Sequence, residues 1–358
     1  MGSTALVFPT TKEAQSLEEL YGLAWYTYSK LERKDLHPAS ELVGSLEALI
    51  DEVLEYKNRL PYILYYRKAA VGILLSLYVL LKLKRVKYST YKDLVHKVIN
   101  IMDRWSWYDY HAEVIYAASL LSTVVPDIDK NKLLKLAEKS YRRGCLKVEE
   151  FKALQEDVEN ILYSILTFIK LKRYHNKLKI FIEILIKDYF VNRVFQDVNT
   201  LTLYCITFSR IYKHLNFIQR KQNVETVRRY LRPAFNELKK IAKHEYLTEL
   251  NEEKLLRLDI KAKIELAKYE IGTIKRIIRR YTMFKRQRIK YELAILILII
   301  YLTLTSYIIA DYNMRIICQL PVSITVCEYV IEDLTGKRFI SKAISRLVGF
   351  ILKFKLAK

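Results

Sequence analysis

One pattern recurs along most of the 358-residue chain: apolar side chains spaced three or four positions apart, followed by a short polar break. This spacing places the apolar residues on one face of an α-helix. It first appears over Ser16–Lys34, where Ser16 and Glu19 stand at the spacing of a capping box. The same signature predicts helices over 42–58, 62–84, 91–104, 111–124, 131–143, 147–173, 176–190, 200–215 and 224–246.

Little in the sequence favours strands or tight turns. The chain holds eight Gly and six Pro, and no Pro lies between Pro126 and Pro233 or between Pro233 and Pro321. Helices joined by short loops pack antiparallel with their neighbours. We therefore expect an all-α protein whose antiparallel helical hairpins form a bundle, a solenoid or an α/α array. Gly144 is expected to end the helix 131–143, because glycine commonly follows a helix C-terminus.

Positive charge is concentrated in the second part of the chain. The formal net charge is +22, yet residues 1–160 hold 23 Lys and Arg against 22 Asp and Glu. Residues 161–358 hold 38 against 17. Charge and hydropathy together indicate three regions: a near-neutral helical region 1–160, a basic helical region 161–292, and a region 293–358 with an apolar and a basic amphipathic helix. A basic region of this strength attracts polyanions.

The densest basic run is the best candidate for a binding site. Its cations, with no acid among them, are Lys275, Arg276, Arg279, Arg280, Lys285, Arg286, Arg288 and Lys290. A second basic helix contributes Arg228, Arg229 and Arg232. Cations along a helix neutralise phosphates, and the interleaved Tyr281, Phe284 and Tyr291 could stack on unpaired bases. We therefore expect a non-enzymatic helical scaffold that binds nucleic acid, DNA or RNA, or a nucleoprotein assembly.

The segment that follows this run supports a different function. Residues 293–310 contain no charged side chain. Eighteen apolar residues behind a basic block are typical of a membrane span, and the alternative is a buried central helix. Residues 337–358 form a basic amphipathic pattern, typical of a helix on a membrane surface or docked on a core. A membrane-associated protein anchored by 293–310 on an anionic membrane surface is therefore the alternative function.

The candidate catalytic pattern is weak. Arg104 and His111 have the spacing of the RNase motif in HEPN-type helical domains, in which Arg binds phosphate and His organises proton transfer. A metal-independent ribonuclease is thus a second alternative, although a chance match is expected in a chain of this composition. His111 and Glu113 match a deaminase HxE, but the required PCxxC is missing. No catalytic residue is therefore assigned.

Metal and cofactor sites are not expected either. Asp127, Asp129, Asn131 and Glu138 follow part of an EF-hand pattern, but Lys132 occupies the position that needs Gly, so helix capping explains them better. The four cysteines are far apart and form no CxxC pair, and no export signal precedes them, so a cytoplasmic protein is expected. Abundant Ile, Lys and Glu resemble proteins of hot environments, or an AT-rich genome. The sequence does not define an oligomeric state.

Overall fold

A computed structural model describes most of the chain between residues 11 and 309. The described residues are 11–33, 40–55, 67–104, 112–174, 177–247 and 258–309, with Arg315, Gln319, Val322, Ser323 and Val326. Every regular element within these ranges is a helix, which confirms the predicted all-α class. The backbone groups into two compact units, Met1–Lys275 and Arg276–Lys358.

Twelve helices have bounds within the described ranges. They are α1 (Thr11–Glu32), α2 (Ser40–Glu55), α4 (Arg67–Lys82), α5 (Tyr88–Arg104), α6 (Ala112–Leu121), α7 (Lys130–Glu149), α8 (Gln155–Lys170), α9 (Leu178–Leu185), α10 (Asp188–Val194), α11 (Val198–His214), α12 (Phe217–Leu247) and α13 (Leu258–Ile308). The boundary between the two units falls within α13, after Lys275.

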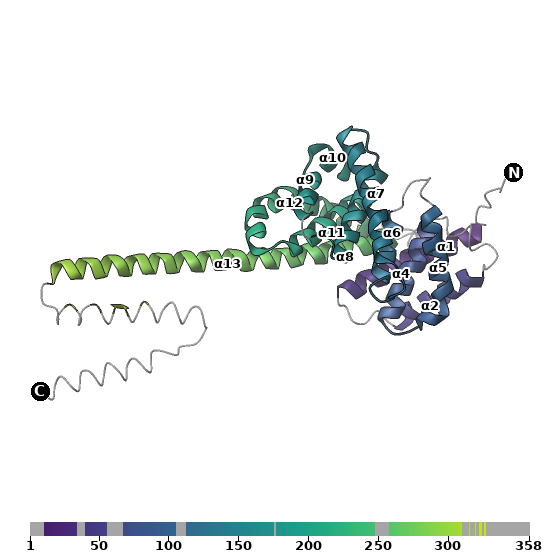
Figure 1. Cartoon of the computed structure of the whole chain (residues 1–358), viewed down its shortest axis with the longest axis horizontal. Coiled ribbons are helices and arrows are strands. Elements are labelled where there is room, and N and C mark those ends of the chain that lie inside the picture. The colour runs from purple at the N-terminus through teal and green to yellow at the C-terminus, as the bar shows by residue number, and fades with distance from the viewer. Residues whose placement is uncertain are drawn as a thin grey trace, which may run out of the picture. The chain divides into compact units, whose positions relative to one another are not determined.

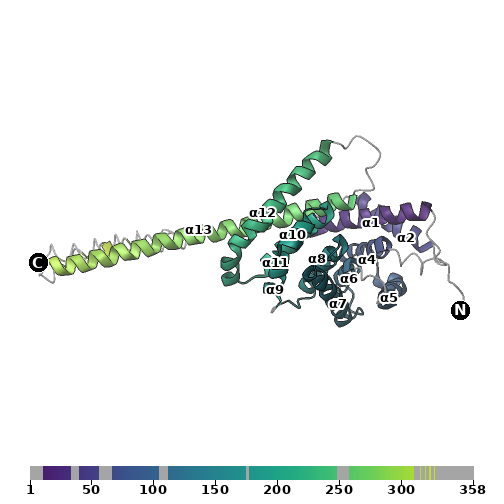
Figure 2. The ribbon, with the colours of Figure 1, turned by 90° about the horizontal axis from the view of Figure 1, so that it is seen from above.

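The first unit is built on a row of helices that are not consecutive in the sequence (Figures 1 and 2). α1 packs on α4, α4 on α6, α6 on α8, and α8 on α11. The helices between them pack on members of the row: α2 on α1, α7 on α6 and α8, and α12 on α11. Helical hairpins placed side by side in this way form the array that the sequence predicts.

The core of the first unit lies inside this row. All of α6 is buried, and so is every residue of α4 from Ala69 to Leu80. The run 69–81 carries no charge and is too short to cross a bilayer, and its burial through Leu80 makes it a core helix. Aromatic rings fill the space between helices, as where Trp25 meets Tyr28 edge to face at 5.5 Å.

The prediction that Gly144 ends a helix is wrong, because α7 continues through it to Glu149. The glycine serves a close helix contact instead. A Cβ added at Gly144 would lie 2.6 Å from Cγ1 of Ile161 and 3.0 Å from the carbonyl oxygen of Asp157, both on α8. Only glycine lets the two backbones approach this closely.

Two other expected boundaries differ from the structure. The helix predicted over 176–190 is divided into α9 and α10, which are separated at Ile186 and Lys187. Ser16 was expected at a helix N-terminus, but α1 begins at Thr11, and the Ser16 hydroxyl instead donates to Glu52 of α2 at 2.9 Å. The three regions proposed from charge and hydropathy stay predictions.

We expect Gly144→Ala to lower the free energy of unfolding by about 1–3 kcal/mol, because the methyl group must displace Ile161 or the α8 backbone. Gly272→Ala is the matched control, since nothing lies within 4 Å of a Cβ there. That variant should gain about 0.5–1 kcal/mol from helix propensity. Urea unfolding of both variants and the parent measures the difference. Equal stabilisation by the two substitutions would contradict the close approach of α7 and α8.

Candidate nucleic-acid interface and the buried charges that hold it

α13 buries two charged side chains near its start, where a docked helix normally presents apolar ones. Lys263 is 1% exposed and Glu270 is 4% exposed. Ala267, Ile271 and Ile274 are buried on the same stretch of helix. A buried charge is costly unless it is paired and hydrogen-bonded. The partners of Lys263 and Glu270 therefore decide how this part of α13 is held in the first unit.

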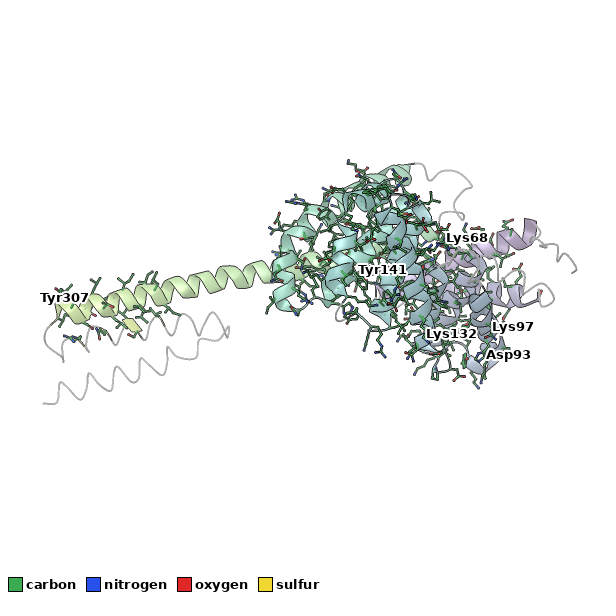
Figure 3. All side chains as sticks on the ribbon, turned by 45° about the horizontal axis from the view of Figure 1, so that its top comes forward. Lys68, Asp93, Lys97, Lys132, Tyr141 and Tyr307 are labelled. Carbon is green, nitrogen blue, oxygen red and sulfur yellow. The ribbon has the colours of Figure 1, made fainter. Side chains whose placement is uncertain are left out.

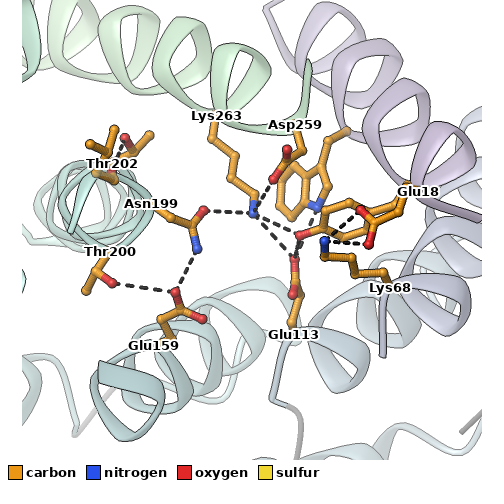
Figure 4. A network of polar contacts seen from close by, with 12 residues as sticks. Glu18, Lys68, Glu113, Glu159, Asn199, Thr200, Thr202, Asp259 and Lys263 are labelled. Carbon is orange, nitrogen blue, oxygen red and sulfur yellow. Dashed lines mark hydrogen bonds and ion pairs between the residues drawn. The ribbon is translucent and has the colours of Figure 1, made fainter. Parts of the chain in front are cut away.

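The Lys263 ammonium is surrounded by groups from three other helices (Figure 4). Its Nζ donates to Oδ1 of Asn199 at 2.9 Å and to the hydroxyl of Tyr21 at 3.0 Å. The Glu113 carboxylate lies 3.6 Å away. The Trp25 ring centroid lies 4.7 Å from Nζ, within cation–π range. Side chains of α1, α6 and α11 thus converge on one cation of α13.

Glu113, on α6, is the anion at the centre of this cluster. Its Oε1 accepts hydrogen bonds from the hydroxyls of Tyr21 at 2.7 Å and Tyr163 at 2.9 Å. The indole Nε1 of Trp25 donates to the same oxygen at 3.1 Å. The Nε of Arg67 donates to Oε2 at 2.8 Å. The carboxylate is 1% exposed, so these donors replace the water it has lost.

The pKa values in the cluster follow from this arrangement. Burial by itself raises the pKa of Glu113. The charges of Lys263 and Arg67, helped by the two tyrosine hydrogen bonds, outweigh burial and lower that pKa to about 2. Burial and the Glu113 charge raise the pKa of Tyr21 and Tyr163 well above 10. At neutral pH the carboxylate is charged and both tyrosines are neutral donors.

Two further carboxylates extend the cluster. Arg67 also donates to Glu159 at 3.0 Å, and Glu159 accepts a hydrogen bond from Asn199 at 2.7 Å. Asp259 lies 3.6 Å from the Lys263 ammonium, one turn earlier on α13. Asn199 therefore joins the cation of α13 to the carboxylate of α8. Each of these groups has at least one polar partner, which makes the cluster a connected network.

A second buried cluster surrounds Arg210 of α11. Its Nη1 donates to the hydroxyl of Tyr116 at 2.7 Å, and its Nε donates to Glu270 at 3.0 Å. Glu32 of α1 lies 3.4 Å from Nη2. Burial raises the pKa of Glu270, but the charges of Arg210 and Lys213 outweigh it and lower that pKa. Through Lys263 and Glu270, α13 thus contributes one charge to each cluster.

We expect Glu113→Gln to reduce the free energy of unfolding at pH 7 by about 3–5 kcal/mol, because it leaves buried cations without their anion. Since the pKa of Glu113 is lowered to about 2 from its usual 4.5, its contribution is complete above pH 4.5 and is lost as the pH falls toward 2. The variant should therefore lose less stability than the parent over that range. Chemical denaturation as a function of pH measures this effect.

Glu183→Gln is the control for that experiment, since Glu183 is 58% exposed and pairs with Lys179 across one helix turn at 3.8 Å. Its unfolding free energy should change by about 0.5 kcal/mol or less. A Glu113→Gln variant with the parent's pH dependence would contradict the assigned role of the carboxylate.

We expect Lys263→Met to destabilise the protein by about 3–5 kcal/mol, because Glu113 and Asp259 lose a cation while the apolar volume is kept. The double variant with Glu113→Gln should be more stable than the sum of the two single effects predicts, since the two charges lie 3.6 Å apart. Thermal and urea unfolding of the two single variants, the double variant and the parent complete the double-mutant cycle. Strict additivity would show that the pair is not coupled.

The basic residues of the candidate interface meet where α12 lies near α13. The Nζ atoms of Lys239 and Lys275 lie 4.8 Å and 4.2 Å from the centroid of one ring, Phe235. Partial burial, followed by the positive charges of Lys239 and Arg232, lowers the pKa of Lys275. The structure thus brings together Arg232 and Lys275, two of the predicted binding residues, from positions far apart in the sequence.

These cations are poorly compensated. Arg228, Arg229 and Arg232 are exposed on α12, and Arg228 pairs with Glu225 at 3.6 Å. Among the residues that the structure describes, no acidic side chain pairs with Arg229, Arg232, Lys239 or Lys275. We define the α12–α13 basic surface as Arg229, Arg232, Lys239 and Lys275. An uncompensated cluster of like charges is favourable for anion binding.

The remaining predicted residues are not part of this surface. Arg276 and Arg279 are exposed and belong to the second unit. The backbone of α13 includes the other members of the basic run, but their side chains lie outside the described residues: Arg280, Lys285, Arg286, Arg288 and Lys290. The same holds for the Arg104 side chain and for all of His111, so the ribonuclease alternative stays a prediction.

The apolar segment 293–310 is described from Ile295 to Ile309, and the side chains of residues 293 and 294 and all of Ala310 lie outside the description. Its interpretation as a buried central helix is wrong for the described part, where Ile297 is 63% exposed and Ile308 is 74% exposed. Over the described ranges, no helix combines the length and the apolar character needed to cross a membrane. The C-terminal helix predicted over 337–358 lies outside the described residues.

The buried clusters were missed in the sequence, although each left a signal. Glu113 is the only charged residue in the mostly apolar run 112–124. Tyr21, Trp25 and Tyr28 recur at helical spacing on α1, a stripe that places hydroxyl and indole donors on one face. By contrast, the expected capping by Asp129 is confirmed, because its side chain accepts from the backbone N–H of Asn131 at 2.9 Å.

Comparison of the chain with protein-family models, with curated proteins and with solved structures finds no match in any of the three.

Proposed function

We propose that this protein is a non-enzymatic helical scaffold that binds nucleic acid, or a nucleoprotein assembly, through the basic part of its chain. One observation carries the proposal: the α12–α13 basic surface gathers cations from two helices, and no acidic side chain among the described residues pairs with them. Lys239 and Lys275 share the Phe235 ring, and Arg232 lies close enough to lower the pKa of Lys275. Cations that repel each other in the free protein are stabilised when a phosphate lies between them.

This electrostatic arrangement favours binding of the phosphate backbone of a nucleic acid. A phosphate beside Lys275 favours the charged ammonium, which offsets the burial and repulsion that lower its pKa. The guanidinium groups of Arg229 and Arg232 suit bidentate contacts with phosphate oxygens. Phosphate contacts of this kind read charge and backbone spacing rather than base identity. The proposed binding is therefore independent of sequence and strongly dependent on salt.

We expect the triple variant Arg229→Gln, Arg232→Gln and Lys275→Gln to bind nucleic acid at least tenfold more weakly at about 0.1 M salt. Each lost phosphate contact should reduce the slope of log affinity against log salt by about 0.7 on a single strand and about 0.9 on a duplex. Fluorescence anisotropy with a labelled 30-nucleotide single strand and the matching duplex, over a range of salt concentrations, measures both quantities.

The control triple Lys135→Gln, Lys139→Gln and Lys179→Gln removes the same charge from exposed positions on α7 and α9. The control triple should change the affinity and the salt slope far less. That difference would distinguish binding at a local surface from an effect of the protein's total charge. Polyglutamate serves as a competitor that represents acidic polypeptides, the other class of polyanion. Failure of the parent to bind at about 0.1 M salt, equal losses in the two triples, or equal displacement by polyglutamate would overturn the proposal.

A further inference from the structure

The apolar end of α13, described over residues 295–308, exposes large apolar side chains over most of its circumference. The exposed fractions are 49% for Ile295, 52% for Leu296, 63% for Ile297, 54% for Ile299, 50% for Ile300, 53% for Leu304, 91% for Tyr307 and 74% for Ile308. Tyr307 marks this end of the helix in Figure 3. An exposed apolar surface of this extent marks an interaction site for a protein partner or a membrane.

One side of this helix already has a neighbour within the second unit. The Nε2 of Gln319 lies 2.7 Å from the Thr305 hydroxyl and 3.0 Å from the carbonyl oxygen of Leu302. Arg315 donates to the carbonyl oxygen of Ile309 at 2.7 Å, which caps the C-terminal end of the helix. The exposed apolar positions lie on the remaining side and cover an arc of about 220°, at about 100° per residue.

The width of this arc decides what can cover it. A second copy of the chain paired in a coiled coil covers a narrow seam formed by positions a and d. Here consecutive residues, Ile295 to Ile297 and Ile299 to Ile300, are all apolar and about half exposed or more. A single packed helix leaves much of that arc in water. Hydrocarbon that surrounds the helix covers all of it.

The Thr and Ser hydroxyls of the segment are paired as hydrocarbon requires. The Thr303 hydroxyl donates to the carbonyl oxygen of Ile299 at 2.8 Å. The Thr305 hydroxyl donates to the carbonyl oxygen of Tyr301 at 2.8 Å, and Ser306 lies 2.9 Å from the Gln319 amide. Hydroxyls bound to their own helix backbone can leave water at low cost.

Charge along the same helix indicates which lipid surface is favoured. Lys285, Arg286, Arg288 and Lys290 precede the apolar end on α13, with no acid between Lys285 and Lys290. Basic residues next to an apolar helix are attracted to anionic headgroups. Within α13 the uncharged residues 293–308 span about 24 Å at 1.5 Å per residue, which is shorter than the about 30 Å of a hydrocarbon core.

We propose that the apolar end of α13 embeds in an anionic lipid bilayer without crossing it, with the preceding basic turns against the headgroups. The proposed site uses residues of the second unit alone, so it is independent of nucleic-acid binding by the first unit. The occupant is the hydrocarbon of the bilayer, and the anionic headgroups set the preference for membrane type.

Vesicle flotation of the full chain tests the proposal. The parent should float with vesicles of phosphatidylcholine and phosphatidylglycerol, and to a smaller extent with phosphatidylcholine alone. Ile300→Lys with Leu304→Lys should reduce the floated fraction at least tenfold, because two ammonium groups then enter hydrocarbon. Ile218→Lys is the matched control: Ile218 is 65% exposed on α12, and its substitution should leave flotation unchanged.

Tyr307→Trp supplies a second measurement that does not depend on a disruptive substitution. Its added indole fluorescence, relative to the parent, should shift to shorter wavelength with anionic vesicles and be quenched by brominated acyl chains. A parent that does not float overturns the proposal. So does a parent whose flotation survives the double substitution, which would show attraction by charge alone. Self-association lost in the double variant, with no flotation of the parent, would identify a second copy as the occupant and also overturn it.

Discussion

A carboxylate that has lost its water is the constraint on which the first unit depends. Glu113 lies in a helix that is buried throughout, and it is stabilised by hydrogen-bond donors from α1, α4 and α8 and by the Lys263 cation of α13. Lys263 is a buried cation, so it likewise needs polar partners in place of water. Neither side chain can be buried alone without a large loss of stability. The row of hairpins and the start of α13 therefore form one cooperative structure rather than an array with an added helix.

Two charge clusters also fix where α13 lies along its axis. Lys263 and Glu270 are seven residues apart, which is two helical turns, and each fits only its own partners. A shift by one turn would bring Lys263 toward the cations around Arg210. Because Ile274 is still buried, the next residue, Lys275, reaches the surface near Phe235 of α12. The buried pairing thus determines the composition of the α12–α13 basic surface.

The helical class and most helices were predictable because apolar spacing along one chain is a local property. The break between α9 and α10 and the continuation of α7 through Gly144 were not, because each depends on what a distant helix places beside it. For the candidate site, the sequence singled out cations on α12 and Lys275, but it did not indicate their proximity. The Glu113–Lys263 pair spans 150 positions, and no local pattern indicates such a pairing.

Partial burial and the neighbouring charges of Lys239 and Arg232 give Lys275 an unusual chemical character, because they lower its pKa. An amine with a lowered pKa is unprotonated in a larger fraction of molecules than an ordinary lysine at the same pH. The unprotonated amine is the form that attacks acyl donors, so a lowered pKa favours acylation of Lys275. Acylation of Lys275 removes one positive charge and thereby reduces the charge repulsion on Lys239 and Arg232. The lysine that strengthens the positive field is thus also one at which a covalent change would weaken that field.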